Sequence, residues 1–142
     1  MRITDVLRRK GDSVVTITPT ETVRELLAAL AGHRVGALVV SSDGRRVDGI
    51  VSERDVVRRL HSDGAGVLDR PVADIMTADV HTCDPDVTTD DMMSEMTRHR
   101  FRHVPVVVDG HLAGIVSIGD VVKYRLDELQ SERDQLTAYI TG

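Results

Sequence analysis

The chain has 142 residues, 41% of them hydrophobic and 29% charged, which is enough for one ordinary domain or two small units that share a core. No apolar run approaches the roughly 18 residues of a membrane span, and the N-terminus lacks the apolar stretch of a signal peptide, so we expect a soluble cytoplasmic protein without membrane contact. The net charge of −5 argues against general nucleic-acid binding, and the single cysteine, Cys83, excludes an internal disulfide and fits a reducing compartment.

A short strand and a helix are the first predicted elements, at residues 13–17 and 22–33. Thr22 and Glu25 have the spacing of a capping box, which marks the start of the helix. The apolar stripe of this helix follows the i, i+3, i+4, i+7 pattern and is formed by Val23, Leu26, Leu27 and Leu30.

A hairpin and a second helix follow. The Asp43-Gly44 pair between two apolar runs is a strong hairpin signal. The nearly continuous apolar run at residues 38–40 favours a strand that is covered on both faces. The next helix is predicted at residues 53–61, so this unit has the order strand, helix, strand, strand, helix.

The whole unit is then repeated. Gly49–Val57 reads GIVSERDVV and Gly114–Val122 reads GIVSIGDVV, with seven of nine positions identical. The second copy has a first strand at residues 81–84 and a hairpin around Asp109-Gly110. We expect an α+β fold of two β-α-β-β-α units, packed sheet to sheet with pseudo-two-fold symmetry, divided as 1–66, 67–126 and a C-terminal helix extension at 127–142.

The last helix continues well past its counterpart in the first copy. Its apolar residues recur at heptad-like spacing, interrupted by Arg133. They are Val122, Leu126, Leu129, Leu136 and Ile140. This pattern suits either a helix that folds back on its own unit or a seam between two copies of the chain, and we favour the dimer contact.

The repeated Ser-x-x-Asp motif stands where a strand meets a helix. A serine at the strand end is a good N-cap, and an aspartate three residues later favours the positive end of the helix. The same geometry also suits a ligand, because helix N-termini favour anions and a carboxylate accepts hydrogen bonds from a vicinal diol such as ribose. Arg54, beside Asp55, adds a planar guanidinium that binds phosphate.

The duplicated order of elements, with GIVSERD and GIVSIGD closing the hairpins and RHVPVV opening one, resembles the cystathionine-β-synthase (CBS) domain pair, or Bateman module. The resemblance covers the chain from about Ile3 to Leu126. It implies disc-like homodimers, and adenosine ligands (AMP, ADP or ATP, sometimes NAD(H) or S-adenosylmethionine) in the cleft between the units.

Carried over by position, the resemblance assigns ribose to Asp55 with Ser52 and to Asp120 with Ser117. The residue before the aspartate approaches phosphate, which is Arg54 in one copy and Gly119 in the other. The expected lining of the base pocket consists of Arg102, His103, Val104 and Pro105, with the first-strand residues Thr16, Thr18, Thr82 and Asp84.

Other groupings are less specific. The spacing of His81, Cys83, His99 and His103 does not match a zinc finger, so we expect no metal. No catalytic set or glycine-rich phosphate loop is present, so we expect no enzyme. The basic run at residues 98–103 is either a solvated helix end or an anion site, with RNA binding as a weaker alternative.

The sequence therefore predicts a regulatory module that binds an adenosine nucleotide and acts on an unknown protein target. The alternative is a purely structural dimerisation adaptor, in which both Ser-x-x-Asp motifs are only helix caps.

Overall fold

The computed structural model describes residues 1–11 and 13–141 and confirms the predicted α+β fold of two repeated units. The elements of the first half are α1 (Ile3–Lys10), β1 (Thr16–Ile17), α2 (Val23–His33), β2 (Ala37–Val40), β3 (Gly49–Ser52) and α3 (Glu53–Asp63). Two short 3₁₀ turns, η1 (Ala65–Asp69) and η2 (Val72–Asp74), connect the two halves. The elements of the second half are α4 (Thr89–His99), β4 (His103–Val108), β5 (His111–Ser117) and α5 (Ile118–Thr141).

Each repeat forms its own small sheet. In the first, β2 lies between β1, to which it is parallel, and β3, to which it is antiparallel. In the second, β4 and β5 form an antiparallel hairpin. The strand predicted at residues 81–84 is reduced to a single parallel bridge between Cys83 and Val106, and the one predicted at 13–17 is shortened to Thr16–Ile17.

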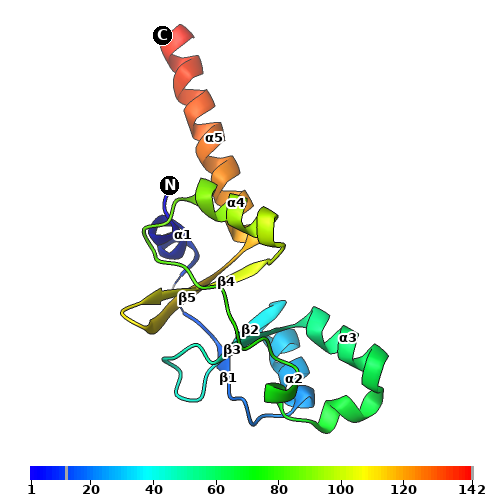
Figure 1. The fold of residues 1–142 in the computed structure, drawn as a ribbon. Helices are drawn as coiled ribbons and strands as arrows, with labels where there is room; N and C mark the ends of the chain where they lie inside the picture. Colours follow the sequence, from blue (N-terminus) through cyan, green and yellow to red (C-terminus); the bar gives the residue numbers. More distant parts are fainter. Residues whose placement is uncertain (12, 142) are drawn as a thin grey trace.

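The two sheets lie between outer layers of helices (Figure 1). Below them, α2 and α3 cover the first sheet, and above them α1, α4 and the base of α5 cover the second (Figure 1). Each sheet and its helices enclose a separate core. Buried residues such as Leu26, Val51 and Val67 build the first core, and Met92, Val104 and Tyr124 belong to the second.

Helix α1 was not predicted, and it packs into the core of the second repeat through Ile3, Val6 and Leu7. The segment that follows the first repeat does the reverse, because Val72 and Ile75 enter the first core. The predicted division at residues 66 and 67 stays a prediction about the sequence repeats. In space, each repeat is completed by the segment that precedes the other repeat.

The C-terminal part of α5 extends away from the body of the protein (Figure 1). Leu126, Leu136 and Ile140 on this helix have 60%, 63% and 80% of their surface exposed. The predicted helix extension is therefore present, and its distal half does not fold back on its own unit.

Candidate functional site

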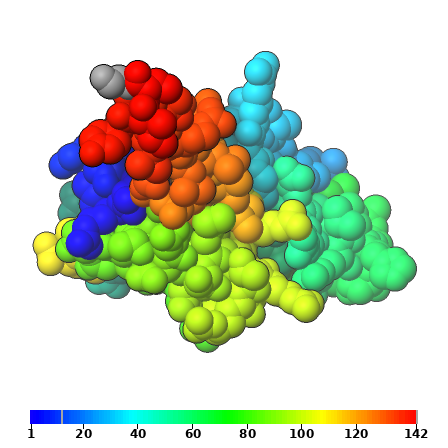
Figure 2. Space-filling view, turned by 90° about the horizontal axis from the view of Figure 1, so that it is seen from above, coloured from blue at the N-terminus to red at the C-terminus, as the bar shows by residue number. Residues whose placement is uncertain are grey.

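A cavity of about 580 Å³ lies where the two repeats meet, at the N-terminal end of α3. Figure 2 shows the yellow-green segment that follows α4 against the green-cyan surface of the first repeat. The first repeat and the linker contribute Gly36, Ala37, Ile50, Ser52, Glu53, Arg54, Asp55, Val57 and Thr77. The second repeat contributes Arg100, Phe101, Arg102 and His103.

Ser52 and Asp55 form a reciprocal capping box at the start of α3. The Oδ2 atom of Asp55 accepts hydrogen bonds from the backbone N of Ser52 (2.8 Å) and from its Oγ (3.1 Å). Among residues 1–11 and 13–141, no protein group donates to the other carboxylate oxygen, Oδ1. The cap therefore orients the carboxylate and leaves one oxygen available for a ligand.

Three arginine side chains come to this cavity from both repeats. Arg54 is on the first turn of α3, and Arg100 and Arg102 follow α4. Within the described part of the chain, none of the three lies within 4.0 Å of a carboxylate, whereas other arginines form ion pairs. Unpaired guanidinium groups around one cavity favour binding of an anion such as phosphate.

Arg100 holds its position through an unusual backbone conformation. Its φ of 59° is left-handed, and it ends α4 as the C-cap residue. Arg34 ends α2 in the same way, with a φ of 55°. Arg34 and Arg100 are equivalent in the repeats, so the fold turns the chain in the same way after both helices.

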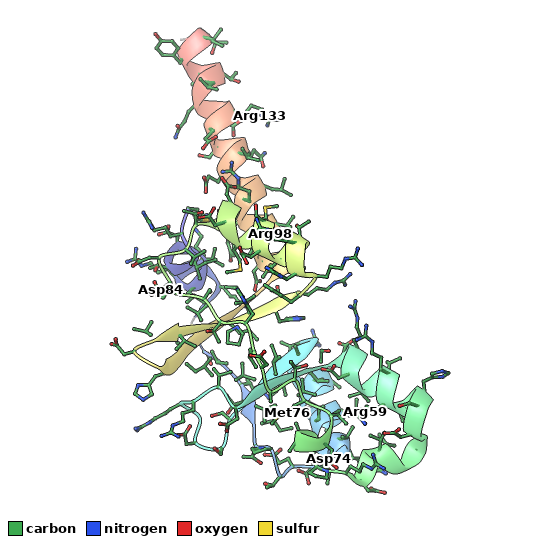
Figure 3. All side chains as sticks on the ribbon, viewed as in Figure 1. Arg59, Asp74, Met76, Asp84, Arg98 and Arg133 are labelled. Atoms are coloured by element: carbon green, nitrogen blue, oxygen red, sulfur yellow. The ribbon has the colours of Figure 1, made fainter. Side chains whose placement is uncertain are left out.

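Thr77 closes one wall of the cavity. Its backbone exchanges two hydrogen bonds of 2.9 Å with Ile50 of β3. Met76, labelled in Figure 3, lies beside β3, where a Cβ atom added at Gly49 would come within 2.7 Å of the Met76 sulfur and 2.9 Å of the Thr77 carbonyl oxygen. Only glycine at position 49 permits this close approach.

His103 lies between the two repeated motifs. A Cβ atom added at Gly36 would lie 3.8 Å from the His103 ring and 3.5 Å from the Glu53 carboxylate. Burial lowers the pKa of His103, and the nearby cations Lys10 and Arg102 lower it further, against the opposite effect of Asp120 and Glu53. The lowered pKa favours the neutral form of the imidazole.

The second motif is built differently. Asp120 accepts from the backbone N of Ser117 (2.9 Å), and its own N donates to Ser117 Oγ (3.1 Å), so the helix cap is present here too. Lys10 of α1 also donates to Asp120 Oδ2 at 2.5 Å. Burial alone would raise the pKa of Asp120, but the hydrogen bonds from Lys10 and Ser117 outweigh it and lower the pKa.

Five of the predicted site residues line the cavity: Ser52, Arg54, Asp55, Arg102 and His103. The others do not line it. Val104 and Pro105 are buried within β4. Thr16 of β1 pairs with Val39 of β2, and the hydroxyl of Thr18 donates a hydrogen bond to Glu21. Thr82 and Asp84 are exposed, and Figure 3 shows Asp84 on the α1 side of the molecule, away from α3. Ser117, Gly119 and Asp120 form the start of α5 beside Lys10.

Four residues at the two motifs were not among the predicted site residues: Lys10, Thr77, Arg100 and Phe101. Thr77 had no signal, because the segment around it is irregular. Phe101 and Arg100 stood inside the basic run at residues 98–103 but were not assigned to the site. Lys10 could have been found from the i, i+3, i+4 spacing of Ile3, Val6 and Leu7, which indicates the helix that carries it.

The histidines and the cysteine have other surroundings. The rings of His81 and His99 both stack on Phe101, with centroids 4.6 and 5.8 Å away. Cys83 lies in the second core, where burial raises the pKa of its thiol to about 12. Over residues 1–11 and 13–141, no group of three or more His, Cys, Asp or Glu side chains is placed to hold a metal ion.

Comparison with known proteins identifies close relatives of the whole chain. A family model described as CBS domain matches residues 3–62 and 72–127. The mitochondrial CBS domain-containing protein CBSX3 of Arabidopsis thaliana is 37% identical, over 99% of this chain and 72% of the relative. In the described part of the chain, no helix is long and apolar enough to cross a membrane.

Solved structures share the fold. The crystal structure of a CBS-domain containing protein from Agrobacterium tumefaciens is 47% identical, covers 88% of this chain and 99% of its own, and has a TM-score of 0.84. A CBS domain protein from Pyrobaculum aerophilum, solved in complex with AMP, is 32% identical, covers 84% of this chain and 89% of its own, and has a TM-score of 0.75.

Proposed function

The chain belongs to the CBS domain family, and from this premise we propose that it is a regulatory module that binds an adenosine nucleotide in the cavity at Asp55. The observation that carries the proposal is the meeting, in one cavity, of the Asp55 carboxylate with cations from the other repeat. AMP, ADP and ATP are the proposed ligands, with NAD(H) as a further candidate. The AMP complex of the Pyrobaculum aerophilum relative supports an adenosine ligand.

The cavity offers a role for each part of such a ligand. The free Oδ1 atom of Asp55 accepts from a ribose hydroxyl, while the cap fixes Oδ2. Arg54, Arg100 and Arg102 supply positive charge for the phosphates. The apolar wall of Ala37, Ile50 and Val57 suits the faces of an adenine ring.

Calorimetric titration with AMP, ATP, NAD(H) and S-adenosylmethionine tests the proposal. A hydrogen bond to a charged group contributes about 1.5–3 kcal/mol, so Asp55→Asn should weaken binding by about tenfold or more. Asp127→Asn is the matched control, because Asp127 is exposed, lies outside the cavity and forms no side-chain hydrogen bond or ion pair within residues 1–11 and 13–141. No heat with any of these ligands, or equal affinity of the Asp55→Asn variant and the wild type, would contradict the proposal.

A second candidate function, dimerisation, is favoured by α5. Leu126, Leu129, Leu136 and Ile140 keep the alternating spacing of a coiled-coil seam and are between 44% and 80% exposed. We propose a homodimer in which this face packs against a second copy of the chain. As a pure adaptor, the protein would form this dimer and bind no nucleotide, which the same titration distinguishes.

The predictions on localisation, enzymatic activity, metal and partners are part of the proposed regulatory function. We propose a cytoplasmic protein without enzymatic activity, resident metal, or nucleic-acid or membrane partner. A nucleotide-bound regulatory module acts on another molecule, and here the protein target is unknown. The buried thiol of Cys83, with its raised pKa, supports a structural role for the only cysteine of the chain.

A further inference from the structure

The two Ser-x-x-Asp motifs share a helix cap but differ in what lies against them. At the first motif, the backbone carbonyl of Ile50 accepts from the backbone N of Thr77 at 2.9 Å. At the second, the equivalent carbonyl of Ile115 accepts from the Nζ atom of Lys10 at 2.7 Å. A neutral backbone segment at one site is therefore replaced by an ammonium group at the other.

Two segments, α1 and the segment before the second repeat, each precede one repeat and pack into the core of the other. Their correspondence explains how Lys10 reaches this position. Leu7 packs against Gly114 as Met76 packs against Gly49, where added Cβ atoms would come within 2.7 Å of Leu7 Cδ2 and of Met76 Sδ. The hydrogen bonds of the two segments also correspond, since Thr4 N donates to the carbonyl of Pro85 and Ala73 N donates to that of Pro19. Leu7 and Met76 are thus structural counterparts.

The chain after these counterparts differs in length. Six residues (8–13) separate Leu7 from Val14, whereas three (77–79) separate Met76 from Val80. In the longer connection, the described residues continue α1 as far as Lys10. In the shorter connection, Thr77 directly follows Met76 and forms a bridge with Ile50 of β3. The added helical residues deliver the lysine to the second motif.

We propose that Lys10 is a built-in occupant of the second Ser-x-x-Asp site, which closes that site and restricts the chain to one ligand, at Asp55. Lys10 donates to both Asp120 Oδ2 and the Ile115 carbonyl, and the same Oδ2 accepts from Ser117 N. Asp120 Oδ1, the counterpart of the Asp55 oxygen assigned to ribose, accepts no hydrogen bond within residues 1–11 and 13–141. The obstacle to a ligand is therefore the Lys10 ammonium itself, which lies between the carboxylate and the Ile115 carbonyl, so a nucleotide at Asp120 would have to displace it. Lys10 and Asp120 are only 30% and 23% exposed, so solvent screens the ion pair incompletely.

This inference rests on the proposed function for the identity of the ligand, but the Lys10–Asp120 pair is testable without one. Carboxyl titration by NMR, with ¹³C-labelled aspartate, follows Asp120 directly. In the wild type, its pKa should lie below that in Lys10→Met, which keeps a chain of similar length. Arg8→Ala is the matched control, because it removes an exposed cation of the same helix and should leave the Asp120 titration unchanged. Equal titration in the wild type and Lys10→Met would overturn the inference.

Calorimetry with ATP tests whether Lys10 closes the second Ser-x-x-Asp site to nucleotide. We expect one equivalent per chain for the wild type and for Arg8→Ala, two for Lys10→Met, and one again for Lys10→Met combined with Asp120→Asn. In the wild-type background, Asp120→Asn should change neither affinity nor stoichiometry, and a loss of binding there would overturn the inference even if Lys10→Met failed to fold.

The titrations distinguish failure of the proposed nucleotide binding at Asp55 from failure of the proposed closure by Lys10. One equivalent in both the wild type and Lys10→Met, lost on Asp55→Asn, would overturn the closure and keep the proposed function. Binding that appears only in Lys10→Met and requires Asp120 would support the closure and contradict the proposed function. No binding to any variant would overturn both.

Discussion

Replacement of Gly49 by alanine should damage both the stability of the first repeat and its site. The new Cβ atom would lie 2.7 Å from the Met76 sulfur, 3.1 Å from Met76 Cγ and 2.9 Å from the Thr77 carbonyl oxygen. The thioether can rotate away, but the carbonyl belongs to a backbone that is tied to Ile50 by two hydrogen bonds. Thr77 must therefore move, and Thr77 is part of the cavity wall.

The size of the effect follows from this overpacking. Extra methyl groups in a packed interior cost about 1–3 kcal/mol. At about 3 °C per kcal/mol for a chain of this length, the thermal midpoint should fall by about 3–9 °C. Circular dichroism measures this midpoint, and calorimetry with AMP should show weaker binding at the same time.

Gly32→Ala provides the matched control. Gly32 lies in α2 with nothing within 4 Å of an added Cβ atom. Alanine is favoured over glycine inside a helix by about 0.5–1 kcal/mol, so this variant should be slightly more stable than the wild type. If Gly49→Ala is as stable as Gly32→Ala, the close approach of residues 76–77 to β3 is wrong.

Three further predictions concern pH, assembly and phosphate. Burial lowers the pKa of His103 in the folded protein. As the pH falls below about 6.5, the unfolded chain therefore binds a proton at His103 before the folded chain does, and the wild type should lose stability. His103→Gln should flatten the slope of the thermal midpoint against pH. An identical slope would contradict it. If the proposed dimer forms through α5, Leu129→Gln with Leu136→Gln should lower the mass in sedimentation experiments from that of a dimer to that of a monomer, and an unchanged mass would exclude the α5 seam. Arg100→Ala should weaken ATP more than adenosine, while Arg58→Ala, outside the cavity, should alter neither; equal weakening of both ligands by Arg100→Ala would remove the phosphate role.

The repeat made much of the fold predictable. The repeated motif GIVS-x-x-DVV predicted a strand, a helix cap and a helix in each copy, and all of them are present in the structure. The Asp43-Gly44 and Asp109-Gly110 pairs lie in the connections between the hairpin strands. Local chemistry determines these features, because caps and turns depend on residues within a few positions of each other.

The site was only partly predictable, because it depends on contacts between the repeats. Ser52 and Asp55 could be paired from their spacing, but the meeting of Asp55 with Arg100 depends on how the two units pack. The same holds for Lys10, which is 110 positions from its partner Asp120. The sequence predicted two sites that differ at Arg54 and Gly119, and the structure adds a second difference, Lys10 beside Asp120, which the motifs do not contain.

A crystal structure of the protein with bound ATP is the most direct test of the central claim. The account predicts a ribose hydroxyl on Asp55 Oδ1, phosphates toward Arg54, Arg100 and Arg102, and Lys10 still paired with Asp120. Nucleotide bound at Asp120 alone, or at a place that contacts neither aspartate, would contradict it.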